Sequence, residues 1–255
     1  MPLQFQSRPA LIAYLTCGDP DVDATRDIAL AAIEAGAEVI ELGVPFSDPV
    51  ADGPVIQRAS ERALRKGTTL ADVLKLAWEL RRAKPRAGLI IFSYFNPVLR
   101  MGLERFAEAA ALAGVDGALI TDLTVEEAGD YLSVMRKRKL ATVFLAAPTS
   151  TDMRLKRIAQ ASRGFVYAVS RTGVTGARQQ VSADARALVR RLRKFTKLPI
   201  AVGFGISTAE QFAEVGRFAD AVVVGSALVE LIERSGKSEA AKAAGGFISR
   251  LRAGH

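Results

Sequence analysis

Cysteine and histidine are almost missing from this chain of 255 residues, in which each occurs once, as Cys17 and as His255, the last residue. One cysteine excludes an internal disulfide and a metal site built from several cysteines, and it fits a reducing compartment. One histidine at the end of the chain argues against a Ser-His-Asp triad and against zinc held by histidines. We therefore expect no metal, and acid–base chemistry falls to Asp, Glu, Tyr, Lys or the single Cys.

Long apolar runs are lacking as well. No stretch reaches the roughly 18 to 20 apolar residues of a membrane span. The first residues, MPLQFQSRPALIAYL, do not join a basic segment to an apolar one as a signal peptide does. The sequence thus predicts an unprocessed, soluble, cytoplasmic protein that does not engage a membrane.

Aromatic residues are few, at 7%, although the net charge of +8 would suit a nucleic-acid partner. Basic residues cluster at 81–86, 136–139 and 190–194. Each cluster falls near the end of a predicted helix, where cations complement the helix dipole. No nucleic-acid-binding module is recognisable. We therefore expect no nucleic-acid partner, and we expect these clusters on the face opposite the carboxyl ends of the strands.

Apolar residues are plentiful, at 49%, and they recur in short runs that alternate with amphipathic stretches. Near-continuous runs of Val, Ile, Leu, Phe and Ala are typical of parallel strands buried on both faces. Eight strands are predicted, at 11–16, 39–44, 89–94, 117–121, 142–146, 165–170, 200–205 and 221–225. Helices are predicted at 23–35, 70–83, 103–113, 125–139, 152–161, 184–195 and 208–215. The segment 55–85 holds two helices, one more than a β/α repeat requires.

This alternation predicts an α/β protein with a single domain, residues 1–255, folded as one (β/α)8 TIM barrel with extra helices. A doubly wound sheet is the alternative, but it normally has a Gly-x-Gly-x-x-Gly turn after the first strand, whereas this chain has TCGDP at 16–20. In a barrel the active site lies at the carboxyl ends of the strands. Ser207 and Glu210 are expected to form a capping box for the helix at 208–215.

One predicted strand carries an acid and leads into an acidic loop, in EVIELGVPFSDPVADGPVIQ at 38–57. Glu41 shares a face of that strand with Val39 and Gly43, because successive side chains alternate. An ionised carboxylate without a partner is costly in apolar surroundings, so Glu41 is expected to keep its proton as a general acid does. Asp48 and Asp52 follow on the loop. The simpler interpretation is a salt-bridged strand residue followed by turn-forming aspartates.

Glycine-rich loops follow the last three predicted strands, with RTGVTGA at 171–177, GFGIS at 203–207 and GSA at 225–227. Backbone N–H groups beside a helix N-terminus bind phosphate, and the loops after the seventh and eighth strands of a barrel often do so. Gly205, Gly225 and Ser226 are the predicted donors. The alternative is that these glycines only form tight turns.

Two further features favour a closed, partly aromatic site. The loop at 171–181 is long for a β/α connection and is a candidate lid that excludes water, unless it is an ordinary surface loop. Tyr167 and Tyr94 lie in or at the end of predicted strands, and with Phe204 they are candidates for lining a flat aromatic pocket. Buried tyrosines more often fill a core and make one hydrogen bond.

Taken together, these motifs resemble the tryptophan synthase alpha subunit family. The similarity rests on ELGVPFSDPVADGPVIQ at 41–57, SRTGVTGA at 170–177, GFGIS at 203–207 and GSA at 225–227, and it runs through the chain in order. It implies a lyase that cleaves indole-3-glycerol phosphate to indole and glyceraldehyde 3-phosphate by a retro-aldol reaction in tryptophan biosynthesis. It implies no cofactor for this chain. The implied partner is the beta subunit, which carries pyridoxal phosphate, in an α2β2 heterotetramer.

The resemblance also implies roles for single residues. Glu41 would be the general acid–base that protonates C3 of the indole, and Asp52 the carboxylate that binds the indole N–H. Thr175 would orient Asp52 when the lid closes. The implied substrate-binding residues are Tyr167 and Tyr94 in and near the pocket, Ile56 and Phe204 as indole walls, and Gly176, Gly205, Gly225 and Ser226 at the phosphate. Asp48, Asn96 and Pro97 would lie on the face that meets the beta subunit.

Two other functions stay open at this point. A barrel that keeps the partner face but has lost catalysis would act as an activating or binding subunit, although the presence of Glu41 and Asp52 argues against this. Another phosphosugar-acting barrel, such as an epimerase, an isomerase or the synthase that makes this substrate, would normally carry metal ligands, paired Asp residues or a catalytic Lys at strand ends. This sequence places no such Lys there.

Overall fold

The computed structural model describes residues 5–169, 178–203 and 205–253, and of residues 178–182 it describes the backbone alone. The strands are β1 (Ala10–Thr16), β2 (Val39–Gly43), β3 (Gly88–Ser93), β4 (Gly117–Ile120), β5 (Ala141–Val143), β6 (Leu145–Ala146), β7 (Val166–Val169), β8 (Ile200–Gly203) and β9 (Ala221–Val224). The helices are α1 (Val22–Glu34), α2 (Pro54–Arg65), α3 (Leu70–Ala83), α4 (Phe95–Met101), α5 (Leu103–Leu112), α6 (Gly129–Lys137), α7 (Asp152–Ala161), α8 (Arg178–Leu192), α9 (Ala209–Gly216) and α10 (Ser226–Arg252).

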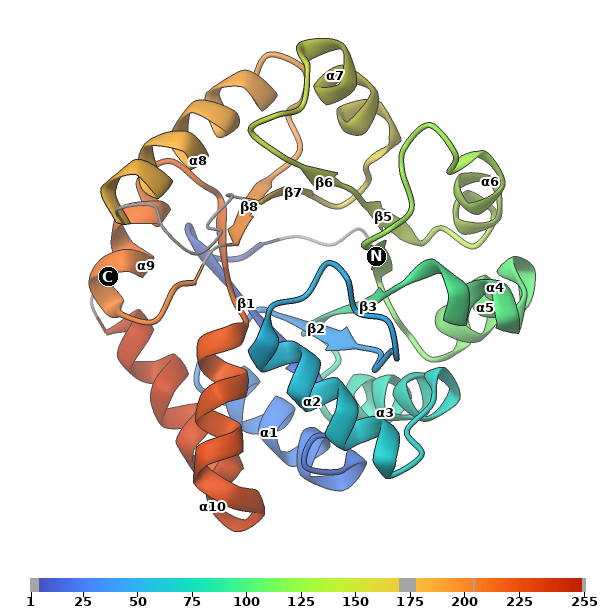
Figure 1. Ribbon diagram of the computed structural model, residues 1–255, viewed down its shortest axis with the longest axis vertical. Coiled ribbons are helices and arrows are strands. Elements are labelled where there is room, and N and C mark those ends of the chain that lie inside the picture. Colours follow the sequence, from blue (N-terminus) through green and yellow to red (C-terminus); the bar gives the residue numbers. More distant parts are fainter. Residues whose placement is uncertain (1–4, 170–177, 204, 254–255) are drawn as a thin grey trace.

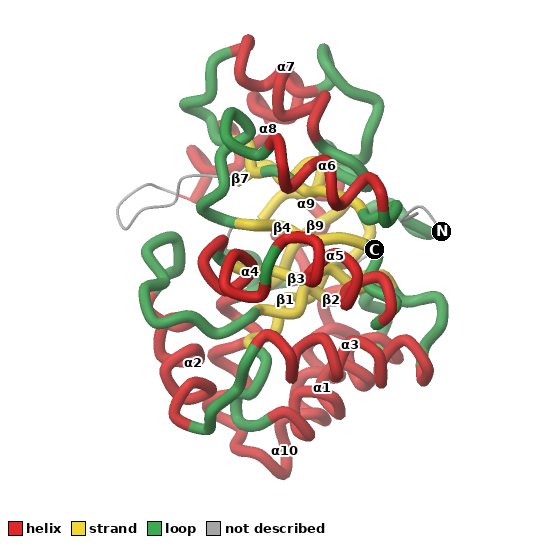
Figure 2. Tube along the Cα trace, turned by 90° about the vertical axis from the view of Figure 1, so that its right-hand side faces the viewer, coloured by secondary structure: helices red, strands yellow, loops and turns green. Residues whose placement is uncertain are grey.

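All paired strands of the sheet run parallel, in the order β5-β4-β3-β2-β1-β9-β8-β7-β6. The two ends of this order, β5 and β6, are consecutive in the chain and are separated by Phe144 alone. The predicted fifth strand therefore pairs with β4 through its first half and with β7 through its second half, so the sheet nearly closes into a barrel. Helices surround it in Figure 1, and Figure 2 shows the strands at the centre of the molecule. The predicted TIM-barrel-like fold with extra helices is confirmed.

Alternation along the strands divides the core into two layers, as predicted for β2. Val39 belongs to the cluster inside the barrel, whereas Ile40, Leu42 and Val44 belong to the cluster between the sheet and the helices. Because Glu41 shares the face of Val39, its side chain is directed into the barrel. The sequence rule thus places one carboxyl group in an apolar interior.

Several element boundaries differ from the predicted ones. The helix predicted at 125–139 begins at Gly129, the helix predicted at 184–195 begins at Arg178, and α4 was not predicted. The box that caps α9 is formed by Thr208 and Gln211, one residue later than predicted, and the side chain of Thr208 accepts the backbone N–H of Gln211. Both register choices offer a hydroxyl followed by an acid or amide three residues on, so the sequence pattern fits either. Among the described residues, no helix is both long and apolar enough to cross a membrane.

The basic clusters have local structural partners. Arg81 donates to the carbonyl oxygen of Gly114 (2.8 Å) and pairs with Asp116 (2.6 Å), just before β4, as expected for the face opposite the carboxyl ends of the strands. Arg191 differs, because it donates to the carbonyl oxygen of Pro148 (3.0 Å) and pairs with Asp152 (2.8 Å), in and beyond the loop that follows β6. The predicted placement is therefore wrong for Arg191, whose role is to tie α8 to that loop.

Candidate active site

Glu41 lies in the middle of β2 and is fully buried, with 0% of its surface exposed. Among the described residues, neither oxygen of its carboxyl group has a hydrogen-bond partner. Burial raises the pKa of the Glu41 carboxyl to about 8, because the charged form would lose its solvation without gaining a partner. The group is therefore protonated at neutral pH and is available as a proton donor to a molecule in the barrel mouth.

Asp52 lies on the loop between β2 and α2 and is half-buried. Its backbone N–H donates to the carbonyl oxygen of Pro49 (3.0 Å), and its own carbonyl oxygen accepts from the side chain of Gln57 (2.8 Å). Burial raises the pKa of the Asp52 carboxyl to about 6, while a hydrogen bond from Tyr94 acts in the opposite direction. Unlike Glu41, this group is mostly ionised at neutral pH and can accept a hydrogen bond from a ligand N–H.

Tyr94 holds the acidic loop in place. Its hydroxyl donates to Oδ2 of Asp52 (3.0 Å) and accepts the backbone N–H of Ala51 (2.9 Å). Its ring stacks on Phe46, with centroids 5.0 Å apart. The sequence places Tyr94 near the pocket, but it does not reveal that this hydroxyl binds the second acid directly.

Tyr14 is a site residue that sequence reasoning missed. It is the Cα partner of Glu41 on β1 and lies on the same inward face, after Ala10 and Ile12. Gly43 leaves room for it, since a Cβ on that glycine would lie 2.4 Å from the Tyr14 hydroxyl oxygen. The period of two in β1 was the available signal, because it puts an aromatic hydroxyl at the carboxyl end of the first strand.

Tyr167 repeats this arrangement on the opposite part of the sheet. It is half-buried on β7, and a Cβ on Gly203 would lie 2.3 Å from its hydroxyl oxygen. Burial raises the pKa of the Tyr14 and Tyr167 hydroxyls well above the usual value, and the charges of Glu41 and Asp52 add to the rise in both. The two acids and the two tyrosines are therefore within electrostatic reach of one another.

One predicted phosphate donor, Gly225, lies next to this group. Gly225 precedes α10, whose first residue is Ser226, and a Cβ on Gly225 would lie 3.6 Å from the Cβ of Tyr14. The first N–H groups of a helix have no partner within the helix, so this end can bind an anion. Gly205 has a positive φ of 43°, a conformation that favours glycine, and it is exposed. Ile56 on α2 packs partly buried against the cluster of Tyr14, Ala59 and Val229.

Three predicted site residues, Thr175, Gly176 and Phe204, lie outside the described residues, as does most of the candidate lid. Within the described ranges, no group of three or more His, Cys, Asp or Glu side chains could hold a metal ion. The described part of the site consists of two acids with different proton affinities, three tyrosines and two glycine-containing loops.

A sequence model of the tryptophan synthase alpha chain family matches residues 2–249. The chain belongs to that family. A tryptophan synthase alpha chain of Solibacter usitatus is 56% identical over 238 residues, which cover 93% of this chain and 89% of the relative. One of Geobacter sulfurreducens is 47% identical over 250 residues, covering 98% of this chain and 94% of the relative.

Solved structures agree with this assignment. The tryptophan synthase complex of Pyrococcus furiosus aligns with a TM-score of 0.89 at 38% identity and covers 98% of this chain and 100% of the solved one. The alpha subunit of Legionella pneumophila aligns with a TM-score of 0.89 at 36% identity, over 96% and 92% of the two chains.

Family membership fixes the reaction. The chain is an indole-3-glycerol-phosphate lyase of tryptophan biosynthesis. The family needs no cofactor for this step, and pyridoxal phosphate belongs to the beta subunit. The resemblance stated from the sequence motifs is confirmed, and an epimerase, an isomerase or another phosphosugar-acting barrel is set aside.

Proposed function

We propose that Glu41 and Asp52 carry the cleavage between them. The bond that breaks joins C3 of the indole to the first carbon of the glycerol chain, which bears a hydroxyl. C3 must gain a proton, and that hydroxyl must lose one as it becomes the aldehyde of glyceraldehyde 3-phosphate. The proton count therefore balances without an external acid, base or metal. The observation that carries the proposal is the full burial of Glu41, whose carboxyl oxygens have no hydrogen-bond partner among the described residues and whose pKa burial raises to about 8.

Glu41 first donates its proton to C3 of the indole, which converts the ring to the indolenine tautomer with a cationic nitrogen. The resulting carboxylate then accepts the proton of the glycerol hydroxyl as the carbon–carbon bond breaks. One carboxyl group thus serves as acid and then as base, and it returns to its starting state. Its pKa of about 8 suits both directions near neutral pH, because donor and acceptor forms are each accessible.

Asp52 stabilises the charge that develops on the ring. Its ionised carboxylate accepts the hydrogen bond of the indole N–H, and this bond strengthens as the nitrogen becomes cationic. Tyr94 supports this role, because its hydroxyl donates to the Asp52 carboxylate and accepts the backbone N–H of Ala51, which holds the loop in place. Thr175 orients Asp52 when the lid over the site closes. The interaction is stronger in the transition state than in the bound substrate, which is what raises the rate.

The remaining residues hold the two ends of the substrate. Ile56, Phe204, Tyr94 and Tyr167 surround the indole. Gly176, Gly205, Gly225 and Ser226 bind the phosphate, for which the N-terminus of α10 supplies free N–H groups and the positive end of the helix dipole. With both ends fixed, the scissile bond lies between Glu41 and Asp52.

The chain acts as a single domain, residues 1–255, within an α2β2 heterotetramer with the beta subunit, in the cytoplasm. A match of the family model over residues 2–249 supports one domain, and the solved complexes of relatives support the assembly. Asp48, Asn96 and Pro97 lie on the partner face. The surface there includes a groove of about 510 Å³ lined by residues of the β2–α2 loop and of α2, among them Phe46, Asp48 and Val50.

Turnover of two site variants tests the catalytic assignment. Glu41→Gln should fold normally and lower the rate of indole release roughly 100- to 10,000-fold, because an amide cannot donate a proton to carbon. Asp52→Asn should lower it on the order of 100-fold, since a neutral amide stabilises the cationic ring poorly. Glu108→Gln, an exposed member of an ion pair on α5, is the matched control and should retain full activity.

The same assay decides between catalysis and a purely activating role. An activating subunit would release no indole from indole-3-glycerol phosphate even at high enzyme concentration, with or without the beta subunit. A Glu41→Gln protein with full activity would remove Glu41 from the mechanism.

A further inference from the structure

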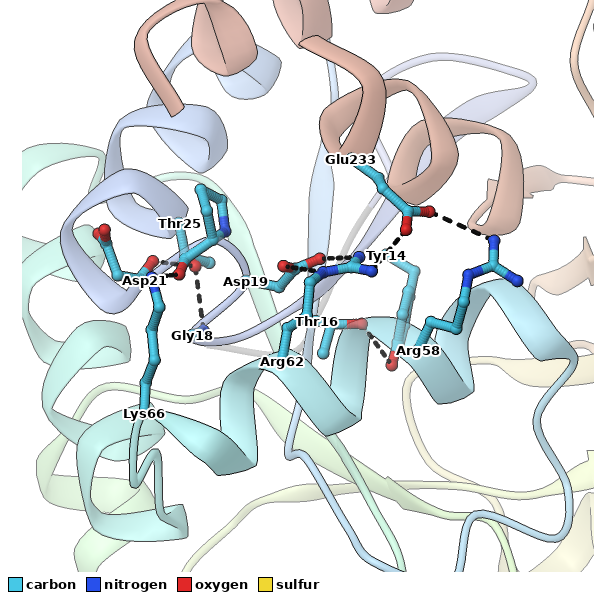
Figure 3. A network of polar contacts seen from close by, with 11 residues as sticks. Tyr14, Thr16, Gly18, Asp19, Asp21, Thr25, Arg58, Arg62, Lys66 and Glu233 are labelled. Carbon is cyan, nitrogen blue, oxygen red and sulfur yellow. Dashed lines mark hydrogen bonds and ion pairs between the residues drawn. The ribbon is translucent and has the colours of Figure 1, made fainter. Parts of the chain in front are cut away.

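Arg62 joins three elements that each carry part of the proposed site. On α2, its guanidinium donates two parallel hydrogen bonds to Asp19, from Nε to Oδ1 and from Nη2 to Oδ2, both 2.8 Å long. Its third nitrogen, Nη1, donates to Glu233 on α10 (2.6 Å). Figure 3 shows Arg62 between the two carboxylates, with Arg58 on the other side of Glu233. Asp19 follows β1, so the loop after β1, α2 and α10 meet at one side chain.

The α2 end of this clamp determines where Asp52 lies. Pro54 begins α2, two residues after Asp52. Within the first turn, Gln57 donates its backbone N–H to the carbonyl oxygen of Gly53 (3.0 Å) and its side chain to the carbonyl oxygen of Asp52 (2.8 Å). The backbone of Asp52 is therefore bonded to the first turn of α2, while its carboxylate is bonded to Tyr94.

The α10 end determines where the phosphate donors lie. Gly225 and Ser226 open α10, and Glu233 lies two turns further along the same helix. A helix is stiff over two turns, so a fixed Glu233 fixes the orientation of the first N–H groups. Arg62 thus connects the indole end of the substrate site to the phosphate end.

Apolar packing of α2 relies on small buried side chains and on the partly buried Val55 and Ile56. The residues of α2 that are buried are small, namely Ala59, Ser60 and Ala63. Ala59 joins the cluster of Tyr14 from β1 and Val229 from α10, and Arg62 links α2 to α10 and to the loop that follows β1. A methyl group against a ring allows sliding, whereas a bidentate guanidinium–carboxylate pair fixes both distance and direction. The Asp19 side chain is only 4% exposed and the Arg62 side chain is 29% exposed, so this pair is partly shielded from competing water.

We propose that Arg62 is a positioning residue that sets the spacing between Asp52 and the phosphate donors at the start of α10. The inference rests on the proposed roles of Asp52, Gly225 and Ser226. Arg62 itself does not take part in the chemistry. Because Arg62 holds α2 and α10 in a fixed arrangement, a substrate that reaches both the indole subsite and the phosphate subsite binds without first reorienting these helices.

Binding of a two-ended ligand and of its separate halves tests this directly. The probes are a non-cleavable indol-3-ylpropyl phosphate, indole alone and inorganic phosphate, each titrated calorimetrically into the full chain. Arg62→Met should weaken binding of the two-ended ligand about tenfold or more, because the two subsites no longer hold their spacing. It should leave the affinities for indole and for phosphate within about twofold of the wild type, because each subsite alone stays intact. The kcat for indole release should fall as well.

Arg65→Met is the matched control on the same helix. Arg65 is largely exposed, and among the described residues its ion pair is with Glu61, at 3.8 Å. The Arg65→Met protein should therefore bind all three probes as the wild type does. Equal loss of affinity for the two-ended ligand and for both halves in Arg62→Met would mean local damage and would overturn the inference. Unchanged affinity for the two-ended ligand, with or without a lower Tm, would also overturn it, since Arg62 would then only stabilise the fold.

Glu233→Gln covers the case in which Arg62→Met does not fold. It leaves the partly buried Arg62–Asp19 pair in place and weakens only the link to α10. The variant should therefore fold, and it should weaken binding of the two-ended ligand alone, about threefold. Wild-type binding by a folded Glu233→Gln protein would overturn the inference. A wild-type chain that fails to bind the two-ended ligand, or an Asp52→Asn variant with unchanged affinity for indole, would instead overturn the proposed site and this inference with it.

Discussion

Glu41 and Asp52 are both carboxyl groups, yet their surroundings give them different affinities for a proton. Glu41 lies on an inward strand position, where its carboxyl group has no hydrogen-bond partner in the part of the chain that the structure describes, and burial raises its pKa to about 8. Asp52 lies on a loop with the Tyr94 hydroxyl as donor, and burial raises its pKa to about 6. Two acids of similar intrinsic strength are thereby separated into a proton donor and an anionic hydrogen-bond acceptor.

The pH dependence of kcat/KM follows from these two values. Glu41 acts in its protonated form, so activity is lost as the pH rises through about 8. Asp52 acts in its ionised form, so activity is lost as the pH falls through about 6. Indole release measured from pH 5 to pH 9.5 should give a bell with its top near the middle of that interval. A rate that stays constant across the whole range would contradict both assignments, and the low-pH limb should disappear in Asp52→Asn.

At this scale the sequence predicts position better than it predicts chemistry. The period of two in a strand suffices to place Glu41 inside the barrel. It does not reveal whether another chain segment supplies a partner, because partners such as the Tyr94 hydroxyl come from residues distant in sequence, 42 positions away for Asp52. Tyr14 was missed for a related reason, since its role depends on Glu41 and Gly43 lying next to it on another strand.

Among the elements, β2 and β1 form a matched pair through Gly43. The glycine faces the barrel interior and leaves the space that the Tyr14 hydroxyl occupies beside Glu41. Tyr167 and Gly203 form the same kind of pair on β7 and β8. A side chain at either glycine would push a tyrosine ring out of the mouth of the barrel.

Gly43→Ala tests this coupling of strands. Its Cβ would lie 2.4 Å from the Tyr14 hydroxyl oxygen, so the ring must move, at a cost of about 1–3 kcal/mol as in other overpacked cores. We expect a lower Tm together with a loss of indole release of about tenfold or more, as a displacement at a catalytic site produces. Gly129→Ala on α6 is the control, because a Cβ there meets nothing within 4 Å. A Gly43→Ala protein with wild-type kcat and KM would show that the position of Tyr14 is immaterial.

The sequence predicts which strands and helices are present better than it predicts where each one begins and ends. Apolar runs identify the strands, but the division of the fifth one at Phe144 depends on its two neighbours in the sheet. The start of α8 at Arg178 is absent from the prediction because the Gly-rich segment at 171–177 and the first residues of α8, which include Gln179 and Gln180, show little apolar periodicity. For α9, Ser207 and Thr208 are equally good caps by type, and only the backbone decides between them.

For the whole molecule, the proposed assignment puts the catalytic residues at one end of the barrel and the partner face beside them. Tyr94 links the two, because it binds Asp52 on one side, stacks on Phe46 of the loop groove and immediately precedes α4. Leu99 on α4 is 51% exposed, near Asn96 and Pro97. Exposed apolar residues, such as Leu99 on α4 and Val50 in the groove, are what a protein partner would bury.

Association with a beta subunit should therefore depend on Leu99. Leu99→Asp should weaken binding to the beta subunit about tenfold or more, because a charge would be buried at the interface, while indole release by the isolated chain stays unchanged. Leu112→Asp is the control, since Leu112 is 77% exposed at the end of α5 and does not line that groove. Sedimentation velocity with a beta subunit distinguishes them. Equal binding by both variants would move the partner face elsewhere.

The fold could be predicted because the strand–helix alternation recurs along the whole chain. The family could be predicted because several specific motifs, such as the one at 41–57, occur in order. The partner was predicted from the family resemblance alone, because the exposure of residues such as Leu99 and Val50 within one chain does not show which of them a partner contacts. The contacts of Arg62 could not be predicted from the sequence either. Arg62 is separated in the sequence by 43 positions from Asp19 and by 171 positions from Glu233.

The ionisation of Glu41 is the central claim, and carbon-13 NMR of the side-chain carboxyl of Glu41 measures it most directly. Protein labelled at the glutamate carboxyl carbon is titrated from pH 4 to pH 10, and the Glu41 signal is identified by its absence in Glu41→Gln. The account predicts a carboxyl that is protonated at pH 6.5 and titrates at about 8. A midpoint near the ordinary value of 4.5, with an ionised Glu41 at neutral pH, would contradict it.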